Sequence, residues 1–107
     1  MIQVEFYDQE GRITGFSVSG HSGYAEAGAD VVCAAVSAAV TFADATIRDV
    51  LGESAKVRVD DGNASVALTL PARCDNEEAV QAVLIGVMLT LGALRDDYPD
   101  YIEVMEV

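Results

Sequence analysis

A stretch near the start of the chain, IQVEFYDQEGRITGFSVS at residues 2–19, sets the expected fold. Residues 2–8 and 13–19 are rich in β-branched and aromatic residues, and a glycine-containing segment that is typical of a turn separates them. We therefore expect a β-hairpin at this end of the chain. Strict alternation along the second strand predicts that Ile13 and Phe16 face opposite sides of the sheet.

A second hairpin is expected further along the chain. The segments KVRVD at residues 56–60 and ASVALTL at residues 64–70 alternate polar and apolar side chains, and DGN at residues 61–63 is a strong turn between them. The segment YIEVMEV at residues 101–107 has the composition of one further strand. The expected sheet therefore has two hairpins and a final single strand.

Two longer segments have the spacing of apolar residues that is typical of amphipathic helices. One runs from about residue 31 to about residue 51, and the other from about residue 76 to about residue 97. The element order ββαββαβ predicts an α+β fold, a two-layer sandwich in which a mainly antiparallel five-stranded sheet carries both helices on one face. The first helix is rich in alanine, and one face of the sheet stays open, so we also expect a homodimer.

The composition is that of one packed domain covering residues 1–107, with 51% hydrophobic residues. The net charge of −12, from 18 acidic and 6 basic residues, argues against direct binding to nucleic acid or to an anionic membrane. The most apolar stretch, residues 79–94, is short for a membrane span and is interpreted as a buried helix. No export signal is visible, so we expect a cytoplasmic protein with free thiols.

The single histidine of the chain lies shortly before a cysteine that follows a helix start. Asp30 is a favourable N-cap for the first helix, and Cys33 falls in its first turn, where the amides and the helix dipole favour a thiolate. The same amides can donate to a developing oxyanion. His21, on the glycine-rich loop at residues 20–29, can fold back over the helix start, take the thiol proton and later protonate a leaving amine.

Structural explanations compete with this assignment. A cysteine in a helix of alanine and valine is most often a small buried hydrophobe, and a lone histidine in a loop is usually only solvated. Cys74 has no second histidine to activate it, and we interpret it as incidental, although a thiol redox role with Cys33 is a further alternative. Two distant cysteines and one histidine are a poor set of ligands for zinc, so no metal is expected.

The segment GHSGYAEAGADVVCAAVS at residues 20–37 resembles the signature of a known family. That family is the ribosomal-processing cysteine proteases, or Prp family, whose signature is commonly G-H-A-x-Y-A, a glycine, and D-I-V-C-A-A-V-S. Ser22 stands where alanine is common and Val31 where isoleucine is common, and both changes are small. The length of the chain and the order of its elements extend the resemblance to the whole chain.

The resemblance implies a cysteine endopeptidase with a Cys–His dyad. Such an enzyme removes a short N-terminal extension from a precursor of a large-subunit ribosomal protein, which is a step in ribosome biogenesis, and it cuts just after a pair of aromatic residues. Carried over, Cys33 is the nucleophile and His21 the general base. The family is homodimeric and uses neither metal nor organic cofactor, and its substrate is a basic protein, in agreement with the acidic charge of this chain.

Gly20, Asp30 and Ser37 also match positions of the signature, and we expect them to support the catalytic pair. Asp30 has two interpretations, because it can cap the helix or orient His21 as the third member of a triad. Ser37 lies one turn after Cys33 and can hydrogen-bond near the site or only within the helix. The alternative function is a non-enzymatic acidic dimer that binds a basic ribosomal protein or an assembly factor.

Overall fold

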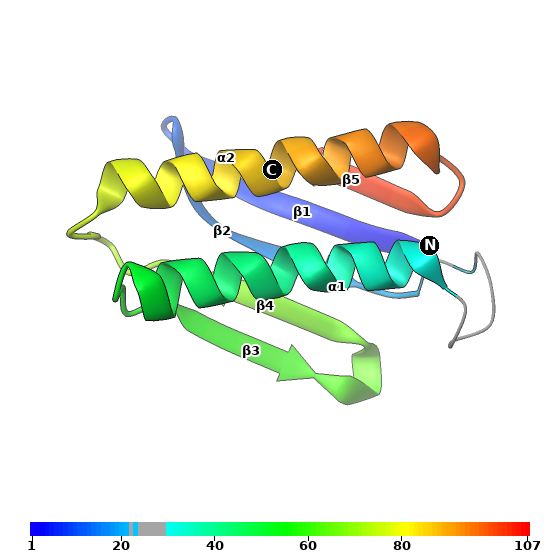
Figure 1. The fold of residues 1–107 in the computed structure, drawn as a ribbon, viewed down its shortest axis with the longest axis horizontal. Coiled ribbons are helices and arrows are strands. Elements are labelled where there is room, and N and C mark those ends of the chain that lie inside the picture. Colours follow the sequence, from blue (N-terminus) through cyan, green and yellow to red (C-terminus); the bar gives the residue numbers. More distant parts are fainter. Residues whose placement is uncertain (22, 24–29) are drawn as a thin grey trace.

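One layer of the protein is a five-stranded mixed sheet (Figure 1). The computed structural model describes residues 1–21, 23 and 30–107. The strands are β1 (Ile2–Gln9), β2 (Arg12–Ser19), β3 (Lys56–Asp60), β4 (Ser65–Thr69) and β5 (Ile102–Glu106). They lie in the order β3-β4-β2-β1-β5, in which β5 is parallel to β1 and the other neighbours are antiparallel. The predicted mainly antiparallel sheet is confirmed.

The second layer consists of two long helical segments that lie side by side in front of the sheet (Figure 1). The first begins as α1 (Val31–Asp44) and continues as the π-helical turn η2 (Ala45–Val50), so it ends close to the predicted boundary. The second is α2 (Glu77–Asp97). Both helices cover the same face of the sheet, as the sequence predicts, and the α+β two-layer architecture is confirmed.

The register of the first hairpin differs from the expectation. Tyr7 pairs with Gly15 but Asp8 pairs with Ile13, so Thr14 is the extra residue of a β-bulge. One inserted residue moves every side chain beyond it to the other face of the sheet. Ile13 is therefore buried in the core, and the prediction that it faces away from Phe16 was wrong.

The hydrophobic core fills the space between the helices and the sheet. Phe6 and Phe16, from adjacent strands, lie with their ring centroids 5.6 Å apart at its centre. The helices contribute the stripe of residues that recurs at helical spacing, and burial of each large side chain stabilises the fold by about 1.5–3 kcal/mol. The helical residues of this stripe are Val32, Val36, Ala43, Ile47, Val80, Leu84, Val87 and Leu91.

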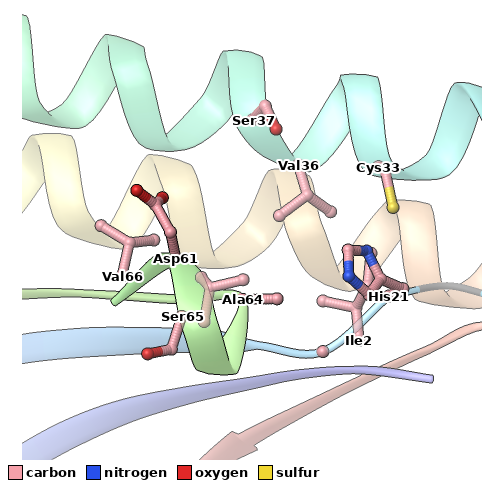
Figure 2. A pocket seen from close by; sticks show the side chains of 11 residues that line it. Ile2, His21, Cys33, Val36, Ser37, Asp61, Ala64, Ser65 and Val66 are labelled. Carbon is pink, nitrogen blue, oxygen red and sulfur yellow. The ribbon is translucent and has the colours of Figure 1, made fainter. Parts of the chain in front are cut away.

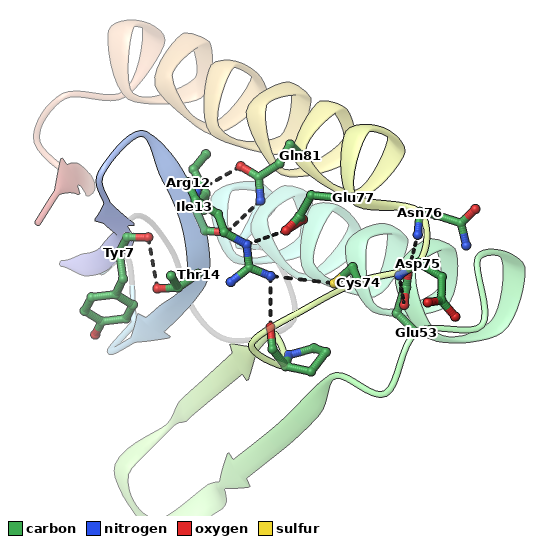
Figure 3. Close-up of polar contacts among 11 residues, drawn as sticks. Tyr7, Arg12, Ile13, Thr14, Glu53, Cys74, Asp75, Asn76, Glu77 and Gln81 are labelled. Carbon is green, nitrogen blue, oxygen red and sulfur yellow. Dashed lines mark hydrogen bonds and ion pairs between the residues drawn. The ribbon is translucent and has the colours of Figure 1, made fainter.

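The start of α2 is held by a buried carboxylate that the sequence did not single out. The carboxylate of Glu53 accepts hydrogen bonds from the backbone amides of Asp75, at 3.2 Å, and Asn76, at 2.7 Å (Figure 3). Asn76 itself makes no side-chain capping bond. Glu53 therefore satisfies amides at the helix entrance from a distant part of the chain.

Both helical segments, Val31–Val50 and Glu77–Asp97, are long and apolar enough to cross a membrane by length and composition alone. Each packs one stripe against the sheet, as core helices do. Apolar side chains also occupy the outward faces of these helices, among them Phe42, Ile85 and Leu89.

Alanine substitutions at Gly15 and Gly92 should change the free energy of unfolding in opposite directions. A Cβ at Gly15 would overlap the carbonyl oxygen of Leu68 on β4, so Gly15→Ala should lower the free energy of unfolding by about 1–3 kcal/mol. A Cβ at Gly92 in α2 meets only the far end of Arg95 at 3.7 Å, so Gly92→Ala should raise it by roughly 0.5–1 kcal/mol. Urea denaturation measures both, and effects of the same sign would contradict this packing.

Candidate active site

A cavity of about 430 Å³ opens beside the N-terminal end of α1 (Figure 2). Its walls come from the segment after β2, from the first turns of α1, and from the β3–β4 turn, which contains the short 3-10 helix η3 (Asp61–Asn63). Gly20, His21, Cys33 and Ser37 all line this cavity. The structure thus brings together four of the five residues that the signature indicates, and the fifth, Asp30, is not among the lining residues.

The backbone conformation of Gly20 determines where His21 lies in the cavity. Its φ of +86° lies in the left-handed region, and a Cβ here would lie 2.6 Å from the carbonyl oxygen of Met1. Its amide donates a hydrogen bond of 3.1 Å to the carbonyl oxygen of Ala64 in the β3–β4 turn. Only glycine fits this crowded position, so Gly20 acts by placing His21.

The thiol of Cys33 and the ring of His21 point toward one another across the cavity (Figure 2). Cys33 is partly buried and lies in the first turn of α1. Within the described part of the chain, no hydrogen bond joins the imidazole to the sulfur. We expect that bond to form only when substrate binds, because catalytic hydrogen bonds are often long before the Michaelis complex forms. Most of the glycine-rich loop at residues 20–29 lies outside the described residues.

Asp30 caps α1, as the first of its two interpretations predicts. One oxygen of its carboxylate, Oδ1, accepts hydrogen bonds from the amides of Val32 and Cys33, both at 3.0 Å, and the side chain is buried. These are the amides that the sequence analysis expected to face an oxyanion. The expectation that these amides donate to an oxyanion needs correction, because in this structure both already donate to the carboxylate of Asp30.

The β3–β4 turn contributes lining residues that the sequence analysis missed. Asp61 and Ser65 lie in or beside this turn, and both line the cavity with Cys33. The pairing of Ser19 with Ser65 brings the turn to the end of β2, two residues before His21. The sequence indicates only that Asp61 belongs to the turn at residues 61–63, and no local pattern shows that this turn meets the helix start.

A second cavity, of about 300 Å³, continues from the first along α1. The two cavities share Val18, Val36, Ser37 and Val66. The second lies between α1 and the inner faces of β3 and β4, and most of its lining is apolar. Its remaining residues are Phe16, Val40, Thr41, Asp44, Val57, Val59 and Leu68. An apolar side chain of a bound peptide can therefore be buried next to Cys33.

Cys74 lies elsewhere, in the segment that leads into α2 (Figure 3). Its sulfur accepts a long hydrogen bond, 3.7 Å, from the guanidinium of Arg12, which is also paired with Glu77. Burial raises the pKa of the Cys74 thiol, and the nearby carboxylates of Glu53 and Glu77 add to that rise more than Arg12 offsets it. Cys74 therefore stays protonated at neutral pH and is a poor nucleophile.

An imidazole and a thiol that share one cavity supply a base and a nucleophile, and the adjoining apolar cavity can hold a side chain of a peptide. The fold and this site define the class as a cysteine-dependent hydrolase. The model of the family described as "Cysteine protease Prp" matches residues 1–103. The chain belongs to this family of cysteine proteases.

Known relatives agree with this assignment. The ribosomal processing cysteine protease Prp of Bacillus subtilis (strain 168) is 29% identical over 94 residues, which cover 86% of this chain and 84% of the relative. The crystal structure of an essential ribosomal processing protease Prp from S. aureus, with a covalently linked product peptide, has a TM-score of 0.89 over the full length of both chains at 24% identity. SMU.848 from Streptococcus mutans has a TM-score of 0.85 at 23% identity, over all of this chain and 94% of that one. These structures share the fold.

Two substitutions of Asp30 distinguish a role as helix cap from a role in a catalytic triad. Asp30→Ala should cost about 1 kcal/mol of stability because the amides of Val32 and Cys33 lose their acceptor. Asp30→Asn keeps an acceptor and should retain both stability and most of the peptidase activity. Thermal unfolding and peptide cleavage measure the two effects. A folded Asp30→Asn variant as inactive as Cys33→Ala would show that the charge itself takes part in catalysis.

Proposed function

We propose that this protein is a cytoplasmic endopeptidase that removes the N-terminal extension of a large-subunit ribosomal protein precursor. The proposal is supported above all by the cavity that joins His21 and Cys33 in a chain of the Prp family. The B. subtilis and S. aureus relatives are named as ribosomal processing proteases, and the S. aureus protein was solved with a substrate peptide as well as with a product peptide. The acidic charge of the chain favours encounter with a basic substrate.

In the proposed mechanism, His21 accepts a proton both when the thioester forms and when it is hydrolysed. His21 takes the thiol proton of Cys33, and the sulfur attacks the scissile carbonyl carbon to give a tetrahedral oxyanion. The oxyanion collapses, the carbon–nitrogen bond breaks, and the leaving amine takes the proton from His21. Water then attacks the thioester with His21 as base, which releases the carboxylate product and restores the thiol.

The apolar cavity beside Cys33 suits an extension that ends in aromatic residues. An aromatic side chain removes much apolar surface from water when it enters such a space. Phe16 and Val66 line this cavity, and Val36 and Ser37 connect it to the cavity of the thiol. The scissile carbonyl would then lie over the sulfur while the neighbouring side chain occupies the apolar cavity.

Cleavage of a peptide that carries the aromatic-ended extension tests the proposal. Cys33→Ala should lower kcat/KM by about three orders of magnitude or more, and His21→Ala by roughly a hundredfold or more, because each removes one partner of the thiol chemistry. Cys74→Ala is the matched control and should stay within about twofold of the unmodified chain, since its thiol is protonated and remote. Mass spectrometry of the products measures the rates.

An active Cys33→Ala variant would overturn the mechanism. An unmodified chain that binds the peptide without cutting it would instead support the non-enzymatic alternative.

We propose further that the outward face of the helical layer joins two copies of the chain. Neither residues 31–43 nor residues 79–94 contain a charged side chain, although the chain as a whole is strongly acidic. Phe42, Ile85 and Leu89 are exposed on this layer, and an apolar hollow of about 560 Å³ lies between the helices. A basic partner would bind carboxylates, and residues 31–43 and 79–94 contain none. The same apolar face of a second copy, in contrast, matches this face in a twofold dimer.

Charge placed on this face should separate the copies. Leu89→Glu, at a side chain that is 66% exposed, should weaken dimerisation by more than about tenfold without unfolding the chain. Val107→Glu, at the exposed last residue, is the control and should leave it unchanged. Sedimentation equilibrium measures both. An unmodified chain that stays monomeric, or that binds lipid vesicles through this face instead, would contradict the proposal.

A further inference from the structure

The β3–β4 turn places one carboxylate in the wall of the active-site cavity. Asp61 lines the same cavity as His21 and Cys33, and its side chain points from the turn toward α1 (Figure 2). The side chain is exposed to solvent within this open cavity. A peptide that lies over the sulfur of Cys33 therefore passes within reach of a negative charge.

Other contacts fix the turn without using this carboxylate. The side chain of the neighbouring Asp60 accepts hydrogen bonds from the backbone amide of Asn63, at 3.3 Å, and from its side-chain amide, at 2.6 Å. The hydrogen bond from Gly20 to Ala64 ties the end of the turn to the chain that carries His21. Within the described residues, the side chain of Asp61 enters no hydrogen bond or ion pair.

The charge of Asp61 has no lysine or arginine counterpart among the described residues of the substrate channel, by which we mean the two connected cavities along α1. Asp44, in the wall of the apolar cavity, is already paired with Arg48, with Oδ1 and Nε 2.6 Å apart. Among the residues described along this channel, Asp61 is thus the carboxylate that remains available to a positive group of the substrate.

We propose that Asp61 is a specificity-determining residue that favours a lysine or arginine side chain of the substrate near the scissile bond. The inference rests on the proposed peptidase function and adds a chemical preference to it. Because the carboxylate is exposed, solvent screens the ion pair, and the expected preference is modest, about two- to fivefold in kcat/KM. High salt should reduce it further.

A positional scan of the aromatic-ended peptide tests this preference. At each position that flanks the scissile bond, matched peptides carry lysine, glutamine or glutamate, and kcat/KM is measured for the full-length protein. At one position the unmodified chain should prefer lysine over glutamine by about two- to fivefold, and this ratio should fall to about one in Asp61→Asn. Asp61→Glu should keep the preference, and Asp61→Lys should favour the glutamate peptide at that position.

Asp49→Asn is the matched control, because Asp49 is also exposed but lines neither cavity. It should leave the lysine-to-glutamine ratio at the value of the unmodified chain. If the ratio at every position is the same in Asp61→Asn and in the unmodified chain, the inference is wrong while the peptidase function stands. If the unmodified chain cuts none of the peptides, the proposed function is wrong, and this inference, which rests on it, is wrong as well.

Discussion

The close passage of Gly20 against the first residue of the chain is the constraint on which the site depends. At this point the chain leaves β2, contacts the carbonyl of Met1, and donates its amide to Ala64. One backbone position thereby holds three segments that are far apart in sequence. His21 is the next residue, so backbone packing positions the imidazole, which makes no hydrogen bond to another residue that the structure describes.

The start of α1 shows how a stabilising contact limits the chemistry nearby. The Asp30 cap satisfies amides that would otherwise be exposed at the helix start, and it orients the turn that carries Cys33. The same bonds withdraw the amides of Val32 and Cys33 from any other acceptor. Stabilisation of an oxyanion therefore needs other donors or a loosening of the cap when substrate binds.

The surface divides into regions with different charges, and each region suits a different partner. The helical layer presents an uncharged face, although acidic residues outnumber basic ones threefold in the chain, with 18 against 6. Among the described residues that line the two connected cavities along α1, the carboxylates are Asp61 and the paired Asp44, and no lysine or arginine is present. The proposed dimer face and the proposed peptide channel are separate, because the hollow between the helices shares no lining residue with the two cavities along α1.

The sequence by itself determined the order of the elements, offered Asp30 as a helix cap or a triad member, and singled out His21 and Cys33 as the candidate catalytic pair. It could do so because periodicity, capping preference and a contiguous signature are local properties. Only the tertiary structure decided that a bulge buries Ile13, that Glu53 serves the distant start of α2, and that Asp61 lines the cavity. Each of these depends on strand register or on backbone contacts between remote segments. Such contacts arise when the sheet pairs and the helices pack, so no local pattern in the chain encodes them.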